Sequence, residues 1–430
     1  MTDKATARFR DKREAILDGA ARLFNQHGVK GAMISEVARS VGLVTNSLTY
    51  YYRKKEDLVA ACLLRSIEAL GQAADAAAEE RTLQARVRGF IDRYLGLLAD
   101  IGAGRHPELI VFSDVLTVTE PHAATVAAAY NQMYRRVRRL LQAPDGAVLE
   151  AAALNARAHL LLSSVTWTRA WLQRYEPDDY ARVAERMAEI LLHGLALSGC
   201  EPAPARPEML LDSAGRDVAD APTREAYLRA ATRLVNQHGY RGASVDRISA
   251  LLQLTKGSFY HHHETKEELI AACFERTFEV MRAAQAAALE APGSGLDRLA
   301  LACRALLAFQ MSPQGPLLRV TAWTGLPDTL RSETRRTMGR LGDRFATLVI
   351  DGMADGSLRV VDPSVAAQVV SGMINAAAEL ERWTRGVDAG NVFDLYAMPV
   401  FTGLQPALAG REAKLTPRQR LVMPDLIRHP

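Results

Sequence analysis

The chain has 430 residues, 48% of them hydrophobic, and a formal net charge of only +4. This length allows two to four domains, and the small charge excludes a chain that binds nucleic acid by charge alone. Ala, Leu and Arg dominate while β-branched runs are few, so we predict an all-α protein. Four cysteines are too few for a disulfide framework in a chain of this length, and we expect them to pack inside the fold.

Several classes of protein are disfavoured by what the sequence lacks. No apolar run reaches the roughly 18 residues of a membrane-spanning helix, and the N-terminus is charged at once, without a signal peptide. We therefore expect a soluble, cytoplasmic protein with no membrane partner. The sequence has no nucleophile elbow, phosphate-binding glycine loop, dinucleotide fingerprint or HExxH zinc motif, so we expect neither an enzyme nor a cofactor. We expect no metal site at the histidine cluster 261–263, because adjacent helical residues point about 100° apart.

One stretch of the chain occurs twice, at 13–65 and at 224–276, and the two copies align without a gap. The two copies are identical at 22 of 53 positions. A gapless match of this length indicates a duplicated folding unit.

Each copy predicts three helices separated by short turns. In the first copy, apolar residues recur at helical spacing over 13–27, and Gly28 is expected to end that helix. Two short helices follow at 34–41 and 45–51, around a turn at Gly42. Two short helices joined by a glycine-containing turn form a helix-turn-helix, whose second helix lies in the major groove of DNA.

The third predicted helix has an inward and an outward side. Leu48 and Tyr52 are four residues apart and are expected to face the core. Short hydrogen-bonding and aromatic side chains then face outward, where they suit bases and phosphates: Thr45, Asn46, Thr49 and Tyr50.

Both copies resemble the DNA-binding domain of the TetR/AcrR family of bacterial transcriptional regulators. The closer match is LTKGSFYHHHETKEELI in the second copy, and the first copy reads LVTNSLTYYYRKKEDLV. The resemblance implies recognition-helix contacts and a phosphate-binding lysine in the first copy at Thr45, Asn46, Ser47, Thr49, Tyr50, Tyr51 and Lys55. In the second copy it implies them at Lys256, Gly257, Ser258, Tyr260, His261, His262 and Lys266.

The copies depart from the family pattern at two places. The family usually begins its second helix with Ser or Thr, and Ser244 fits this N-cap role whereas Met33 does not. The family usually has Phe four residues after the buried Leu, where this chain has Tyr52 and His263. These departures leave open whether both heads bind DNA.

Charge is unevenly distributed between the two copies. Residues 1–65 contain 12 Lys and Arg against 7 Asp and Glu, whereas residues 212–276 contain 9 of each. The N-terminal arm before residue 13 is basic, and it either contacts the DNA backbone or is a frayed, solvated terminus.

The remaining sequence predicts further helices in each half. In the first half they are expected at 56–71, 82–100, 109–118, 122–142, 148–173 and 178–197. In the second half they are expected at 265–289, 295–311, 326–353, 363–385 and 391–408. The resemblance implies that the last two helices of a unit pair two units through a four-helix bundle.

We expect two units, each with a DNA-binding head and a helical effector and dimerisation domain. The proline-rich stretch between them is predicted to be a linker. The expected boundaries are 1–65 for the first head, 66–198 for its helical domain, 199–221 for the linker, 222–276 for the second head, 277–410 for its helical domain and 411–430 for a disordered tail.

The resemblance also implies a small, largely apolar effector bound inside the helical domains. Large apolar side chains are the candidates for such a site, with ordinary core packing as the alternative for each of them. In the first unit they are Tyr94, Phe112, Met133, Trp167 and Trp171. In the second unit they are Phe309, Met311, Trp323, Met338, Phe345 and Trp383.

These observations predict a tandem TetR-type transcriptional regulator, a repressor that binds a double-stranded DNA operator and is released by its effector. We expect an intramolecular pseudo-dimer that binds an asymmetric site, because the two recognition helices differ at nearly every outward position. One alternative is a homodimer of chains with four heads. Another is a helical small-molecule-binding or interaction protein that has lost DNA binding.

Overall fold

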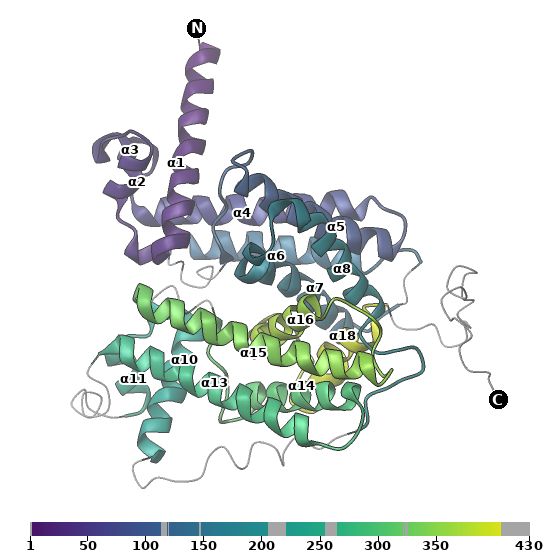
Figure 1. Ribbon diagram of the computed structural model, residues 1–430. Coiled ribbons are helices and arrows are strands. Elements are labelled where there is room, and N and C mark those ends of the chain that lie inside the picture. Colours follow the sequence, from purple (N-terminus) through teal and green to yellow (C-terminus); the bar gives the residue numbers. More distant parts are fainter. Residues whose placement is uncertain are drawn as a thin grey trace, which may run out of the picture.

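The computed structural model describes residues 2–112, 118, 120–145, 148–204, 221–253, 265–320, 322 and 326–405. The regular secondary structure of these residues is helical, and the only β contact among them is an isolated antiparallel bridge between Ala196 and Leu358. The predicted all-α class is therefore confirmed. Figure 1 shows two helical bodies, one from each half of the chain, that lie against each other.

The first head begins with a longer helix than the sequence pattern predicted. Helix α1 (Thr2–Gly31) starts well before residue 13, so the frayed-terminus alternative is wrong for the backbone of the arm. Gly28, at φ 68°, breaks the helix in two, as expected for a glycine at a helix end. Helices α2 (Ile34–Ser40) and α3 (Thr45–Tyr51) follow where they were predicted.

Among the described residues, the body of the first unit contains five α-helices, the first of which begins in the head. They are α4 (Lys55–Ala78), α5 (Leu83–Gly102), α6 (Ala123–Leu140), α7 (Ala151–Trp171) and α8 (Tyr180–His193). Helix α4 packs along both α5 and α6, because its buried side chains recur every three or four residues and form one apolar stripe. That stripe includes Leu58, Cys62, Leu63, Ile67, Leu70 and Ala74.

The helix predicted at 109–118 is wrong over the described residues 109–111, which have no regular secondary structure. Apolar residues in this stretch fit a helical period, but backbone groups of Leu109 and Val111 bond to side chains of α1 and of Arg169 instead. The carbonyl of Glu108, just before the stretch, bonds to Arg65. The head therefore captures this segment, here called the α5–α6 loop (residues 103–112).

Over its described residues, the second unit repeats the order of helices. Its head contains α10 (Ala221–Gly242), which Gly239 breaks at φ 69°, and α11 (Val245–Leu251). Its body contains α13 (Lys266–Glu290), α14 (Gly295–Met311), α15 (Asp328–Ala354) and α16 (Pro363–Ala376). The helices predicted at 363–385 and 391–408 are both shorter and interrupted: η5 (Ala377–Glu379) and α17 (Leu380–Trp383) follow α16, and a π-helical turn, η6 (Phe393–Ala397), precedes α18 (Met398–Thr402).

The last helices of the two units pack together, with α7 and α8 against α16, η6 and α18. The contact is reciprocal: Leu195 N donates to Val400 O at 3.0 Å, and Leu404 N donates to Leu191 O at 2.8 Å. Such a pairing of equivalent groups is what a two-fold interface between subunits produces.

Two glycines allow this close approach. Gly194 and Gly403 both have positive φ, 72° and 93°, and they occupy equivalent places at the ends of α8 and α18. A Cβ atom on Gly194 would lie 2.1 Å from Phe401 O, and one on Gly403 would lie 2.2 Å from Leu192 O. Larger residues at either position would therefore push the units apart.

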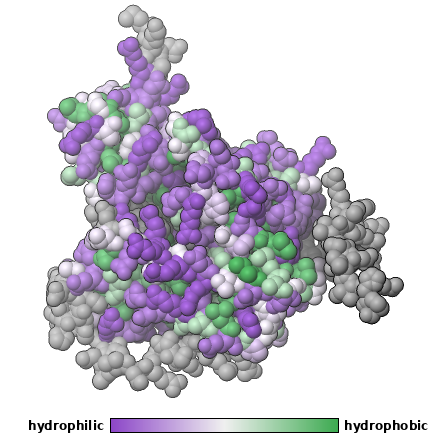
Figure 2. Space-filling view, in the orientation of Figure 1, coloured by the Kyte–Doolittle hydropathy of each residue, from purple (hydrophilic) through white to green (hydrophobic). Residues whose placement is uncertain are grey.

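The surface is mainly hydrophilic on the face that Figure 2 shows, with a smaller hydrophobic area at the right of the view. Among the described residues, no helix is long and apolar enough to cross a membrane.

Candidate functional site

Helix α3 presents the candidate recognition surface of the first head. Of the six side chains predicted there to contact DNA bases or backbone, only Tyr51 is half-buried, and the others are exposed: Thr45, Asn46, Ser47, Thr49 and Tyr50. This exposed row is free of core packing and is accessible to a macromolecular partner.

The inner side of α3 is anchored as predicted. Leu48 is fully buried and Tyr52 is 5% exposed. The Tyr52 hydroxyl accepts a hydrogen bond from Arg13 Nε at 2.9 Å, and burial raises the pKa of Tyr52. Tyr52 thus fills the place where the family usually has Phe, because its one polar atom reaches a partner at the edge of the core.

A residue that the sequence reasoning missed packs against the recognition helix. The Phe9 ring stacks on Tyr51 with centroids 4.9 Å apart and meets Tyr50 edge-on at 6.1 Å. Phe9 and Arg13 are four residues apart on α1, so they share a face, and Arg13 contacts α3 through Tyr52. This spacing was the available signal that the arm lies beside α3.

Lys55 does not extend into solvent. Its Nζ donates to the carbonyl of Ala32, in the segment that joins α1 to α2. The same first turn of α4 is also bonded to the body through Asp57. Asp57 Oδ2 accepts from Lys54 N at 2.9 Å, and Asp57 Oδ1 lies 2.7 Å from His122 Nε2. The hydrogen bond with His122 is the main reason why the pKa of Asp57 is lowered.

The second head is described in part. Ser244 caps α11 as predicted, since its side chain accepts from Arg247 N at 3.2 Å. Met33, in contrast, makes no side-chain cap, and Glu36 accepts from its backbone N–H instead. Lys266 is the half-buried first residue of α13. The other predicted contacts lie outside the described residues: Lys256, Gly257, Ser258, Tyr260, His261 and His262.

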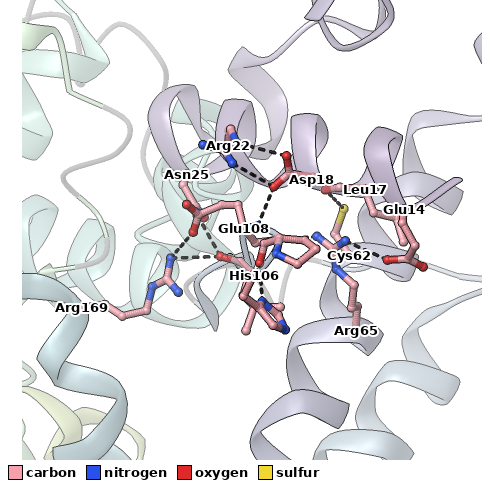
Figure 3. A network of polar contacts seen from close by, with 12 residues as sticks. Glu14, Leu17, Asp18, Arg22, Asn25, Cys62, Arg65, His106, Glu108 and Arg169 are labelled. Atoms are coloured by element: carbon pink, nitrogen blue, oxygen red, sulfur yellow. Dashed lines mark hydrogen bonds and ion pairs between the residues drawn. The ribbon is translucent and has the colours of Figure 1, made fainter. Parts of the chain in front are cut away.

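Polar side chains of the first head hold the α5–α6 loop (Figure 3). Asn25 on α1 donates to Leu109 O and accepts from Val111 N, both at 2.9 Å. Arg65 on α4 pairs with Glu14 on α1 at 3.2 Å and also donates to the carbonyl of Glu108. Because both lone-pair and donor groups of the Asn25 amide are used, the loop is fixed in position relative to α1.

The second unit has the same arrangement at equivalent positions. Asn236 on α10 donates to Leu317 O at 2.8 Å and accepts from Arg319 N at 3.0 Å. Arg276 on α13 pairs with Glu225 on α10 at 2.6 Å and donates to Gln314 O at 2.6 Å. Each head is therefore bonded to the loop of its own body by an Asn and an Arg at equivalent positions. We call these two sets of contacts the Asn–Arg links. Asp18 adds a contact in the first unit, and Arg233 adds two in the second.

A cavity of about 110 Å³ lies where the two bodies meet. Its lining includes Leu109 and Val111, which Asn25 holds, and Arg319, which Asn236 holds. The structure brings four of the candidate ligand residues together in this lining: Tyr94, Phe112, Trp167 and Trp383. Three of the four come from the first unit and Trp383 comes from the second.

Two ion pairs tie the walls of the cavity to the loops. Arg169 on α7 pairs with Glu108 at 2.7 Å, and Arg319 pairs with Glu379 at 2.6 Å. All four side chains are between 14% and 17% exposed, so solvent screens these pairs less than surface pairs. His159, also in the lining, is buried and approaches the carbonyl of Ala376 in the other unit at 3.2 Å.

The other candidate ligand residues are spread over different environments. Trp171 and Met338 line a wider hollow of about 540 Å³, also between the units, together with Trp167. Met133, Phe309 and Phe345 are buried and Met311 is half-buried; these four line neither cavity. Trp323 lies outside the described residues. No group of His, Cys, Asp or Glu in the part of the chain that the structure describes is arranged to hold a metal ion.

Comparisons with known proteins match this architecture. The model of the family "Bacterial regulatory proteins, tetR family" matches twice, at residues 16–62 and 228–273. The chain is a tandem TetR-type regulator. A "Tetracyclin repressor-like, C-terminal domain" matches this regulator at residues 292–383, in the second body.

Individual relatives cover parts of the tandem regulator. It is 26% identical over 144 residues to the HTH-type transcriptional repressor DhaR of Mycobacterium sp. (strain GP1). This match covers 33% of this chain and 73% of DhaR. It is 37% identical over 54 residues to the transposon Tn10 TetC protein of Escherichia coli, or 13% of this chain and 27% of TetC. The solved TetR family regulator PfmR from Thermus thermophilus is 25% identical, with 42% of this chain and 98% of PfmR covered and a TM-score of 0.36. The matched domains identify a DNA-binding, non-enzymatic transcriptional regulator.

Proposed function

We propose that this TetR-type regulator represses transcription by binding an operator with two unlike half-sites, one for each head. The observation that carries the proposal is the reciprocal packing of α7 and α8 on α16 and α18 within one chain. Family dimers place two identical recognition helices about one turn of DNA apart. Here both heads belong to one polypeptide and lie at the same end of the molecule (Figure 1), while their recognition sequences differ.

We further propose that a small molecule in the body releases the operator. The Asn–Arg links support this proposal, because each bonds a head helix to a loop beside the cavity between the units. A ligand that fits better when these loops shift would favour a second arrangement of the heads. DNA release would then result from a shift in the populations of the two arrangements, and the difference in the ligand's affinity for them sets the size of the shift.

The first experiment is a footprint of the purified full chain on DNA upstream of its own gene, with binding measured at several salt concentrations. An asymmetric protected site with a steep salt slope is the expected result. Replacing Asn46 and Tyr50 together by Ala should weaken binding roughly tenfold or more, since base contacts contribute about 1–3 kcal/mol each. Arg81→Ala, at an exposed position in the body, is the matched control and should change little.

Stoichiometry on the DNA separates the pseudo-dimer from a dimer of chains. Sedimentation of the complex should give one chain per site. A palindromic site with two chains would contradict the pseudo-dimer, and it would mean that one type of head dominates. If neither this DNA nor a genome-wide selection yields salt-sensitive binding, the protein is instead a helical ligand-binding or interaction protein.

A further inference from the structure

The cavity between the units has the size and walls of a site for one aromatic ring. Its volume is about 110 Å³, of the same order as the roughly 150 Å³ apolar cavity that admits benzene but somewhat smaller. Aromatic side chains from both units form much of its wall, and Tyr130 and Trp383 bring their ring centroids within 4.7 Å of each other. Phe112 meets Tyr130 edge-on at 6.0 Å, an arrangement that a flat aromatic ligand can extend.

Three residues in the lining carry buried polar atoms that have no hydrogen-bond partner among the described residues. They are Ser66 Oγ from α4, Arg319 Nε and Trp383 Nε1. Ser66 is only 2% exposed. The guanidinium and indole N–H groups can only donate, and the hydroxyl can donate as well. Buried donors without acceptors destabilise a fold, so these atoms indicate a ligand that supplies an acceptor oxygen.

The charges around the cavity cancel. Arg169 is neutralised by Glu108, and Arg319 is neutralised by Glu379. Burial lowers the pKa of His159, which keeps its imidazole neutral near pH 7. A carboxylate ligand would therefore lose its hydration without meeting an unpaired cation, whereas a neutral acceptor such as a carbonyl would not incur that cost.

We propose that this cavity binds a neutral, single-ring aromatic molecule that carries a carbonyl or similar acceptor oxygen, and that one bound molecule acts on both heads. The second part rests on the proposed function. It follows from the shared lining, because Leu109 and Val111 are held by Asn25 of the first head and Arg319 is held by Asn236 of the second.

Binding to the full chain is tested by calorimetry, with tryptophan fluorescence as a second signal. The probes are acetophenone, which has a ring and a neutral carbonyl, benzoate, which is charged, and ethylbenzene, which has no oxygen. Acetophenone should bind at one molecule per chain and at least tenfold more tightly than the other two. Equal or tighter binding of benzoate or ethylbenzene, or binding of none of the three, would overturn the proposal.

Matched variants locate the probe. Ser66→Ala and Trp383→Phe each remove one unpartnered donor in the lining and should weaken acetophenone binding roughly three- to tenfold. Ser164→Ala and Trp171→Phe are the controls, because Ser164 Oγ and Trp171 Nε1 are equally buried and unpartnered but do not line this cavity. If the control variants weaken binding as much as the cavity variants, the site is elsewhere.

DNA binding is measured separately with and without acetophenone. Salt-sensitive DNA binding in a protein that binds no probe leaves the proposed repressor intact and overturns only the site. Probe binding that leaves the affinity for both half-sites unchanged supports the site and contradicts its action on the heads. The expected result is a loss at both half-sites that requires roughly three- to tenfold more acetophenone in the Trp383→Phe variant.

Discussion

The two heads agree in how they are joined to their bodies and differ in what they offer to DNA. Asn25 and Asn236 bond to their loops in the same way, and even the buried thiols of Cys62 and Cys273 both contact a carbonyl of the first helix of their own head. In contrast, the recognition stretch reads TNSLTY in one copy and KGSFYH in the other. After duplication, the contacts that join a head to its body were kept while the recognition surface diverged.

The two bodies differ in a second respect: the loop carries the negative charge of an ion pair in one body and the positive charge in the other. In the first body the loop supplies the acid, Glu108, and the helix supplies the base, Arg169. In the second body the loop supplies Arg319 and the helical segment supplies Glu379. A buried pair satisfies both charges in either orientation, so the link between loop and helix requires a pair but does not require a given polarity.

Breaking these ion pairs should have the largest effect on stability. Glu108→Gln and Glu379→Gln each leave a mostly buried guanidinium without its counter-charge, and each should lower the free energy of unfolding by about 3 kcal/mol. Urea denaturation followed by circular dichroism measures this. Combining Glu108→Arg with Arg169→Glu copies the polarity of the second body and should restore most of the loss. No recovery in the double variant would mean that the two pairs are not interchangeable.

Removing the Asn amides should have an intermediate effect. Asn25→Ala leaves Val111 N–H without its partner, while Leu109 O keeps its hydrogen bond from Arg169. Asn236→Ala removes the partner of both Arg319 N–H and Leu317 O, and each variant should cost about 1–3 kcal/mol. Each variant should also weaken ligand response at one half-site only, as measured by footprinting of separate half-sites. Asn236→Asp keeps the acceptor for Arg319 N but cannot donate to Leu317 O, so it should lose less stability than Asn236→Ala. Equal loss at both half-sites would show that the heads are not controlled separately.

The sequence predicted the parts of the fold that local pattern controls. The repeat identified both heads, and Ser244 was recognised as an N-cap because this role depends on adjacent residues only. It did not predict the non-helical α5–α6 loop, since Asn25 and Arg65 capture that segment from a distance of more than 40 residues along the chain. The extension of α1 was missed because its packing partner is Tyr51, on another helix.

The candidate ligand residues show the same limit. Composition identified large apolar side chains, but only the fold separates Tyr94 and Trp383, which line the cavity, from Met133 and Phe345, which are core. The cavity draws its walls from both halves of the chain, whose bodies share no alignment detectable by eye. No sequence pattern therefore predicted that Arg319 lines the same cavity as residues of the first unit.

The smallest expected effect concerns acid stability at the start of α4. The hydrogen bond from His122 lowers the pKa of Asp57, so the native state favours the carboxylate. The resulting stabilisation of the folded state is fully present above the unfolded-state pKa of about 4. It is lost as the pH falls through the lower pKa of the folded state. Both side chains are about one-third exposed, 33% for Asp57 and 28% for His122, so we expect less than about 1 kcal/mol.

Urea denaturation between pH 5 and pH 3 measures this contribution. Asp57→Asn and His122→Ala should both flatten the loss of stability in this window, while Asp178→Asn, at an exposed position, should leave it unchanged. Since Asp57 also accepts from Lys54 N, His122→Ala should remove only the part that the body contributes. An identical acid profile in all three variants would mean that His122 does not stabilise the carboxylate, and that the first head is held to its body by its Asn–Arg link without this contact.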